Sequence, residues 1–291
     1  MQSDEIRETY LRFFEERGHL RVPSASLIPA PEDTSTLLTI AGMQPFKPYF
    51  SGAQKPPSPR ICSVQRCFRT PDIEEVGKTR RHLTFFEMLG NFSLGDYFKQ
   101  GAVEFALELS LEGFGFAQDD IWITVFEGDP DLGIGLDEEA VDAWLEIGVP
   151  RERIVPCNRK ENFWESGPTG LCGPCSELYF DRGLEFGKPD DLPGGDNERF
   201  IEYWNLVFMQ YDQEPRNQLT PLPAKNIDTG LGLERLAALL QGVPSVFETD
   251  VFRPLVDLGE QMSGRRYGSD FTTDRALRIL AFGGDGARPA A

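Results

Sequence analysis

The sequence is short of basic residues. It carries 29 lysines and arginines against 47 aspartates and glutamates in 291 residues, for a formal net charge of −18. Proteins that bind nucleic acid unaided are usually basic overall, because neutralising phosphates supplies most of their non-specific affinity. We therefore expect any contact with RNA to be local, or to be made by a part that this chain does not include.

Cysteines and long apolar runs are also scarce. The five cysteines are an odd number, and no signal peptide is evident at the N-terminus. This pattern argues against a framework of disulfides and predicts a reducing, cytoplasmic setting. The longest apolar runs are too short to cross a bilayer, so we expect no association with a membrane.

Apolar periodicity and glycines divide the chain into helices and strands. Ile6, Tyr10 and Phe14 recur at helical spacing within residues 4–17, and Gly18 follows as a stop. The same patterns predict helices at 97–113, 138–147 and 231–241, strands near 36–41, 60–69, 81–88, 121–126 and 201–209, and an exposed loop at 183–196. Because helices and strands do not alternate strictly, we expect an α+β domain. The chain also lacks the glycine-rich motifs GxGxxG and GxxxxGK[ST], which excludes the usual phosphate-cradling loops.

The most informative segment runs from Arg60 to Ser93, RICSVQRCFRTPDIEEVGKTRRHLTFFEMLGNFS. Two strand-like runs joined by a polar loop predict a hairpin. Arg69 leaves the first strand as a charged fork that suits a phosphate oxygen. Arg81 and His82 return on the second strand, where alternation lets one of them share the face of Arg69. Such a hairpin is suited to hold a phosphate chain.

Two adjacent phenylalanines follow on the returning strand. Phe85 and Phe86 must point to opposite faces, so one faces a site and the other faces the core. The pattern does not decide which of them stacks on a flat ring. An ordinary solvated hairpin with a phenylalanine stripe would account for a single RxxxF spacing, but not for the length and composition of the whole run.

The segment SVQRCFRTPDIEEVGKTRRHLTFFEMLGNFSLGDYFK resembles motif 2 of class II aminoacyl-tRNA synthetases, in the form shown by the alanyl-tRNA synthetase family. The resemblance covers roughly residues 5 to 280. It implies an antiparallel sheet flanked by helices rather than a Rossmann fold. Further matching segments follow in order: GHLRVPSASLIP (Gly18 to Pro29), AGMQPFKPYF (Ala41 to Phe50), ENFWESG (Glu161 to Gly167), CGPCSELYFDRG (Cys172 to Gly183), IEYWNLVFMQY (Ile201 to Tyr211) and PLPAKNIDTGLGLERLAALLQGV (Pro221 to Val243).

The resemblance implies an ATP site with two halves. The run DTGLGLER, Asp228 to Arg235, lets the backbone approach a ligand at its glycines, and its arginine would cover the adenine opposite a motif 2 aromatic. Taken alone, this run could be a helix entry with an exposed ion pair. The implied ATP-binding residues are Arg69, Arg81, His82, Phe85, Phe86, Gly232 and Arg235, with Arg69 also catalytic on the α-phosphate.

An amino-acid pocket is implied beside the ATP site. Asp228 would accept hydrogen bonds from the substrate ammonium, and Asn205 would meet its carboxylate. Trp164 and Val207 would wall the pocket, which Gly230 completes. Such a pocket admits a methyl group but discriminates poorly against glycine and serine, because one methylene or hydroxyl is worth only ~1–3 kcal/mol. Two simpler interpretations stay open: core packing for the tryptophan and a helix N-cap for the aspartate.

Two differences from the family pattern fall near this pocket. Ile40 stands where the family usually has an asparagine, and Ser166 where it commonly has a methionine. Both changes could alter affinity. The CGPC run, Cys172 to Cys175, has no second ligand pair, and the two histidines lie elsewhere, so we expect no zinc. We interpret CGPC as a tight loop lining the substrate pocket.

The metal implied by the family is Mg²⁺ bridging the phosphates of ATP. Its carboxylate ligands cannot be separated by sequence among Asp72, Glu74, Glu87 and Glu202. The motif 2 acid that many class II enzymes carry two residues after the arginine is Pro71 in this chain.

The resemblance implies a ligase that activates alanine with ATP to alanyl-adenylate, for attachment to alanine tRNA. We expect a catalytic domain at 1–252, the start of a helical tRNA-recognition domain at 253–280 and a disordered tail at 281–291, with weak tRNA charging. A truncation, a frame shift and a genuine short paralogue would each explain the tail. The alternative functions are a paralogue that activates a small amino acid for another acceptor, and a binding module without catalysis.

Overall fold

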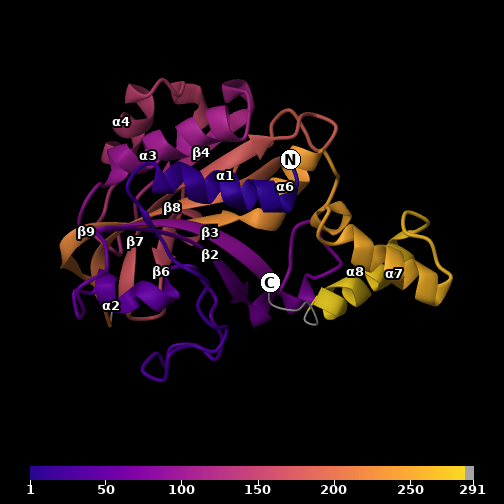
Figure 1. The fold of residues 1–291 in the computed structure, drawn as a ribbon. Coiled ribbons are helices and arrows are strands. Elements are labelled where there is room, and N and C mark those ends of the chain that lie inside the picture. Colours follow the sequence, from indigo (N-terminus) through magenta and orange to yellow (C-terminus); the bar gives the residue numbers. More distant parts are fainter. Residues whose placement is uncertain (216, 286–291) are drawn as a thin grey trace.

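The computed structural model describes residues 1–215 and 217–285, and its centre is one largely antiparallel sheet (Figure 1). Within these residues the strand order is β1-β2-β3-β9-β8-β7-β4-β5, with β6 paired to β7, and only β1–β2 and β4–β5 are parallel. The strands are β1 (Leu20–Arg21), β2 (Arg60–Phe68), β3 (Phe85–Leu94), β4 (Ile121–Phe126), β5 (Ile154–Cys157), β6 (Phe163–Glu165), β7 (Gly170–Asp181), β8 (Phe200–Glu214) and β9 (Gln218–Gly232). The expected α+β class is confirmed.

Helices lie on both faces of this sheet, and the larger group covers one face (Figure 1). The α-helices are α1 (Ser3–Glu15), α2 (Lys47–Phe50), α3 (Lys99–Glu108), α4 (Glu138–Glu146), α5 (Arg159–Asn162), α6 (Leu233–Gln241), α7 (Arg253–Ser263) and α8 (Phe271–Asp285). The buried side of α1 carries Ile6, Tyr10 and Phe14, the periodicity that predicted it. These side chains share one core with apolar residues of α3, α4, α6 and the central strands.

The central strands β8 and β9 alternate between this core and the opposite face. Trp204, Leu206 and Phe208 of β8 point into the core, as do Ile227 and Leu231 of β9. The residues between them therefore face away from the helices, where a ligand can reach them. The two strands are antiparallel neighbours, so the polar positions of one lie beside those of the other.

Several predicted boundaries are wrong. Residues 36–41 form no strand, and the returning strand begins at Phe85, so Arg81 and His82 precede it in a loop. The helix expected from Leu231 begins at Leu233, because β9 continues to Gly232. The strands β1, β5, β6, β7 and β9 were not predicted.

The CGPC run is a strand rather than the expected tight loop. It lies in β7, with an irregularity in the pairing to β8 between Cys172 and Cys175 that accommodates the proline. Gly173 is required by close packing, since a Cβ there would lie 2.1 Å from the carbonyl oxygen of Phe208. None of the four residues lines the cavity that Asp228 and Arg69 share.

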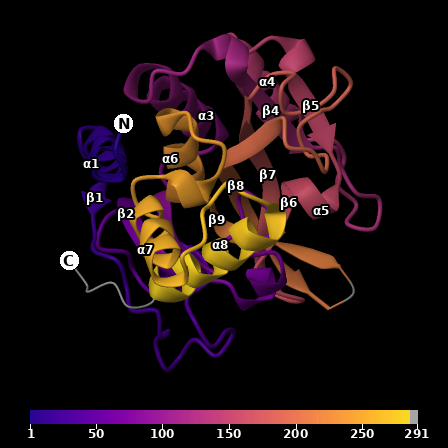
Figure 2. The same cartoon turned by 90° about the vertical axis from the view of Figure 1, so that its right-hand side faces the viewer.

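Helices α7 and α8 pack against each other beside the sheet (Figure 2). The prediction of a disordered tail at 281–291 is wrong for residues 281–285, because α8 continues to Asp285 and Ala281 is only 1% exposed. Residues 286–291 lie outside the described residues. The boundary predicted at 252/253 stays a prediction. Among the described residues, no helix is long and apolar enough to cross a membrane.

Candidate active site

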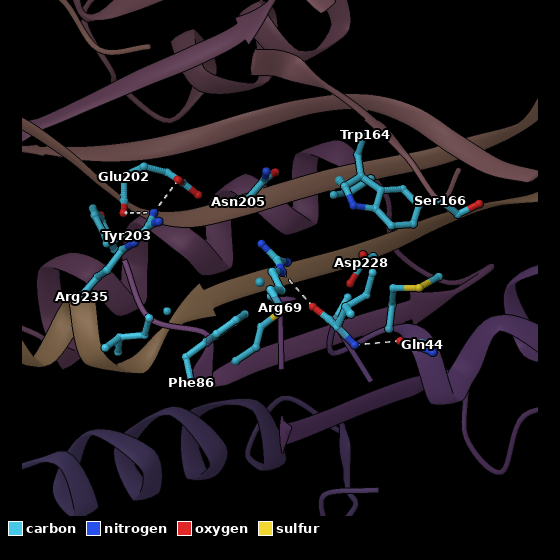
Figure 3. A pocket seen from close by; sticks show the side chains of 18 of the residues that line it. Gln44, Arg69, Phe86, Trp164, Ser166, Glu202, Tyr203, Asn205, Asp228 and Arg235 are labelled. Atoms are coloured by element: carbon cyan, nitrogen blue, oxygen red, sulfur yellow. Dashed lines mark hydrogen bonds and ion pairs between the residues drawn. The ribbon is translucent and has the colours of Figure 1, made fainter. Parts of the chain in front are cut away.

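A cavity of about 350 Å³ opens on the face of the sheet opposite α1, α3, α4 and α6 (Figure 3). Its wall combines β3, β8, β9, the start of α6, Trp164 of β6 and the segments on either side of β2. The predicted site residues that line it are Arg69, Arg81, His82, Phe86, Trp164, Asn205, Val207, Asp228, Gly230, Gly232 and Arg235. Phe85 does not line it, although Phe86 does.

Arg69 lies between the two ends of the cavity in the view of Figure 3. Its Nε donates to the carbonyl oxygen of Ile40 at 2.9 Å, and its guanidinium carbon is 5.1 Å from the centre of the Phe86 ring. The two terminal nitrogens donate no hydrogen bond to any described residue. The side chain is therefore fixed at its base, while its charged end is available to an anion. The backbone of Ile40 makes this contact, so it does not depend on the side chain at that position.

Arg235 projects from the first turn of α6. It donates to Glu202 twice, through Nη1 to the carboxylate Oε2 at 2.6 Å and to the carbonyl oxygen at 3.1 Å. Figure 3 shows Arg235 and Phe86 toward one end of the cavity and Trp164 toward the other. A guanidinium and an aromatic ring near one another form a surface suited to a flat heterocycle.

Asp228 supplies a carboxylate without a partner. Asp228 lies in β9, and its exposed fraction is 6%. Its carboxylate makes no hydrogen bond or ion pair with any described residue. Burial raises the pKa of its carboxyl to about 7, against the lowering effect of the nearby Arg69. The helix N-cap interpretation is wrong, because Gly232 occupies that position. A buried, unpaired carboxylate is suited to receive a ligand cation.

Asn205 pairs with Gly230 across the two strands, and Val207 with Asp228. The Asn205 Nδ2 donates to Glu177 Oε1 at 2.9 Å, whereas its Oδ1 is buried without a partner among the described residues. Val207 packs in a small apolar cluster with which Trp164 is in contact. Trp164 thus both packs against apolar neighbours and lines the cavity, so its two interpretations are compatible.

Glu177 is a buried carboxyl that the sequence interpretation missed. Its Oε2 accepts a hydrogen bond from the Tyr179 hydroxyl at 2.7 Å. Burial, with the charge of Glu202 adding to it, raises the pKa of Glu177 well above its ordinary value. The residue faces Asn205 in the register of β7 with β8. Predicting β7 as a strand would have identified it.

The segment AGMQPFK supplies part of the wall although no role was predicted for it. The Oε1 of Gln44 accepts from the backbone N–H of Ile40 at 2.9 Å, and its Nε2 donates to Asp33 at 2.9 Å. These bonds hold the loop whose carbonyl oxygen fixes Arg69. Glu234 also lines the cavity, and burial, with the charge of Glu87 adding to it, raises its pKa to about 8.

The carboxylates considered for Mg²⁺ differ in position. Glu202 lines the cavity, whereas Glu87 is paired with Arg7 at 2.5 Å and lines no part of it, and neither does Glu74. The side chain of Asp72 lies outside the described residues. Among described residues, no cluster of three or more potential ligands could hold a metal. Since Mg²⁺ commonly binds through one or two carboxylates plus substrate phosphates, Glu202 fits an ion carried by a nucleotide.

No cysteine is among the described residues that line the cavity. Cys172 and Cys175 are buried and free, and burial raises the pKa of Cys172 to about 12. A reactive thiol or a zinc ligand needs the opposite shift, since the thiolate is the active form.

The family model described as tRNA synthetases class II (A) matches residues 5–285. The alanine–tRNA ligase of Rubrobacter xylanophilus is 52% identical in an alignment 290 residues long, which covers 97% of this chain and 32% of that protein. The alanine–tRNA ligase of Natranaerobius thermophilus is 49% identical over 301 residues, covering 100% of this chain and 33% of that protein. This chain thus spans about a third of the length of these curated relatives. A solved structure of apo S. aureus histidyl-tRNA synthetase covers 82% of this chain and 66% of its own, with a TM-score of 0.48 and 13% identity. This chain belongs to the class II (A) tRNA synthetase family.

Proposed function

We propose that this chain activates alanine with ATP, forming alanyl-adenylate and pyrophosphate. The observation that carries the proposal is the combination, in one cavity, of the unpaired carboxylate of Asp228 and the guanidinium of Arg69 with two free nitrogens. Alanine brings an ammonium that matches the first group, and ATP brings phosphates that match the second. The names of the relatives, alanine–tRNA ligases about half identical to this chain, support the same substrates.

The amino-acid end of the cavity supplies three separate contacts. Asp228 accepts from the ammonium, and the second N–H of the Asn205 amide is free to donate to the carboxylate, since Glu177 engages only one side of that amide. Val207 and Trp164 then enclose the methyl group. A wall of this kind excludes bulky side chains, but it separates alanine from glycine and serine by only ~1–3 kcal/mol.

The chemical step is a transfer of the adenylyl group. One oxygen of the alanine carboxylate attacks the α-phosphorus, the bond from that phosphorus to the β-phosphate oxygen breaks, and pyrophosphate leaves. Arg69 stabilises the charge that builds on the α-phosphate, and its bond to Ile40 orients it before the reaction. Arg81 and His82 contact the departing phosphates, and Arg235 and Phe86 hold the adenine. Glu202 would hold a Mg²⁺ carried by ATP, whose charge would offset that of the phosphates.

The acceptor of the activated alanine is, by the same proposal, an alanine tRNA. The net charge of −18 leaves little general attraction for an RNA backbone, so recognition has to come from local contacts. Charging of an alanine tRNA, with a tRNA of altered acceptor stem as control, tests this part separately from activation.

The decisive experiment is ATP–pyrophosphate exchange with purified, folded protein. We expect exchange that depends on alanine, with weaker exchange for glycine and serine and none for leucine. The matched control is Asp228→Asn, which keeps the size of the side chain and removes its charge. Absence of exchange with all small amino acids would refute activation, and equal exchange without any amino acid would point to a different reaction.

A further inference from the structure

The loop joining β2 to β3, residues 69–84, carries much of the nucleotide end of the cavity. Arg69, Arg81, His82 and Leu83 all line it from this loop. The two ends of the loop are joined by a backbone bond from Arg69 N to Thr84 O at 2.8 Å. A 3₁₀ turn at Thr70–Glu74 shapes its first part, and the backbone N–H of Val246 donates to the carbonyl oxygen of Arg80 at 3.0 Å. Its remaining support comes from what packs against its outer side.

The pair of helices α7 and α8 packs against that outer side (Figure 1). Val76 and Leu83 of the loop are 4% and 5% exposed, and they share an apolar cluster with Leu277 and Ala281 of α8, which are 2% and 1% exposed. Phe86 packs against the same cluster. Leu83 is thus part of the cluster that includes α7 and α8, and Phe86 packs against it, while both also line the cavity.

Polar contacts join the same two parts. Arg278 of α8 is 8% exposed, donates from Nε to the Tyr267 hydroxyl at 2.7 Å and reaches the carbonyl oxygen of Gly77 at 3.5 Å. Gly77 has a φ of +80°, and a Cβ there would lie 3.0 Å from the carbonyl oxygen of Arg275. The left-handed turn thus favours glycine, and a side chain there would crowd α8.

We propose that the α7–α8 pair is a positioning element for the nucleotide end of the cavity: it fixes the 69–84 loop, with Leu277 and Arg278 as positioning residues that contact no substrate. This rests on the proposed function, since it assigns ATP to that end. It follows that a change on α8 weakens ATP binding, although α8 lies outside the cavity. Asp228, Asn205 and Val207 belong to β8 and β9, so alanine binding stays unaffected.

The test compares two leucine truncations. Leu277→Ala removes part of the apolar cluster that α8 shares with the loop, and Leu107→Ala removes a leucine of similar burial, 6% against 2% exposed, from the core on the other face of the sheet. We expect Leu277→Ala to raise the Kd for MgATP about tenfold, and Leu107→Ala to change it less than about twofold. The ATP measurement uses binding calorimetry, so it needs no turnover. Equal effects of the two variants would overturn the proposal.

A second pair guards against a variant that fails to fold. Arg278→Gln and Arg278→Lys keep the apolar cluster, and only the lysine can still donate with a charge to Gly77 or Tyr267. We expect Arg278→Gln to speed amide hydrogen exchange of residues 70–84 and weaken MgATP binding, and Arg278→Lys to restore part of both. If amide hydrogen exchange of residues 70–84 were unchanged in Arg278→Gln, the proposal would be overturned. Suppose that the wild-type protein binds MgATP, and that the Arg278 variants respond as expected, without any alanine-dependent pyrophosphate exchange by the wild type. In that case the proposed function fails and the positioning role stands.

Discussion

The two ends of the cavity are built differently. At the amino-acid end, Asn205, Val207 and Asp228 sit on paired central strands, whose other faces are buried in the main core. At the nucleotide end, the cavity is lined by the 69–84 loop, which packs against α7 and α8. This loop contributes Arg69, Arg81, His82 and Leu83. The amino-acid end is therefore fixed by the register of the sheet, whereas the nucleotide end depends on contacts made far along the chain.

The two ends also differ in charge. At the amino-acid end, the buried carboxyl of Asp228 has no partner among the described residues, and Glu177 is bonded to Asn205. The nucleotide end carries several arginines together with carboxyls: Arg81 donates to the carbonyl oxygen of Asn197 at 3.1 Å, Arg235 is paired with Glu202, and Glu234 also lines the wall. This division matches a substrate that presents its ammonium to one end and another that presents phosphates to the other. It also means that substitutions at the two ends have separable effects.

The largest expected effect is at Arg69, where the two ends meet. Arg69→Ala should lower the rate of alanine-dependent pyrophosphate exchange by about 10²–10³-fold, because a prealigned donor to the reacting phosphate is lost. Arg69→Lys keeps the charge but cannot reproduce the contact from Nε to Ile40 together with a fork to the phosphate. The exchange rate of Arg69→Lys should therefore lie between that of the wild type and that of Arg69→Ala. A loss below threefold in Arg69→Ala would remove this residue from the chemical step.

At the amino-acid end, Asp228→Ala should raise the KM for alanine by about 100-fold, since a buried charge-assisted contact is worth about 3 kcal/mol. The Kd for MgATP should change less than about twofold, because the nucleotide end does not share this residue. Steady-state exchange at varied alanine, with calorimetry for MgATP, separates the two. A parallel loss of both affinities would show that the ends are not independent.

The protonation of Asp228 gives a pH dependence to the same end. Burial raises the pKa of this carboxyl to about 7, and only the ionised form pairs with an ammonium. We therefore expect the KM for alanine to fall by about five- to tenfold between about pH 6 and about pH 8. Asp228→Asn should lose this dependence, while any remaining slope would report other groups, such as Glu234.

Folding stability should show the opposite trend, measured by urea denaturation. Because the folded pKa of Asp228 is above its ordinary value of 3.8, the folded state holds a proton that the unfolded chain releases. The stabilisation is complete below about pH 4 and is lost as the pH rises through about 7. At about pH 8, Asp228→Asn should then raise the free energy of unfolding by about 1–4 kcal/mol. A destabilised asparagine variant would show that the carboxylate has a partner in solution.

The sheet end of the cavity could largely be predicted from the sequence. Alternation in IEYWNLVFMQY already put Asn205 and Val207 on one face, and the structure confirms that they share it. The same logic would have reached Glu177, but CGPC suggested a turn. The proline is tolerated there because the pairing with β8 is irregular, and this depends on the neighbouring strand rather than on local sequence.

The loop end was less predictable. Arg81 and His82 were expected on a strand, but their positions depend on Val76 and Leu83 packing against Leu277 and its neighbours. Those contacts join residues about two hundred positions apart, so local propensity carries no information on them. For the same reason, the sequence predicted a disordered tail from residue 281, whereas Ala281 is buried. Long-range packing, not local preference, decides this end.

The smallest expected effect separates the two motif 2 phenylalanines, which alternation could not assign. Phe86 lines the cavity and lies beside Arg69, whereas Phe85 does not line it and pairs with Phe68 of β2. Phe86→Ala should raise the Kd for MgATP about five- to tenfold, because stacking with an aromatic ring is worth about 1 kcal/mol. Phe85→Ala removes the same number of atoms one residue away and should change that Kd less than about twofold. Neither variant should move the KM for alanine, because the sheet end does not include them. If Phe85→Ala weakened MgATP binding as much as Phe86→Ala, adenine stacking could not be assigned to Phe86, and the nucleotide end would be sensitive to any loss of packing near the loop.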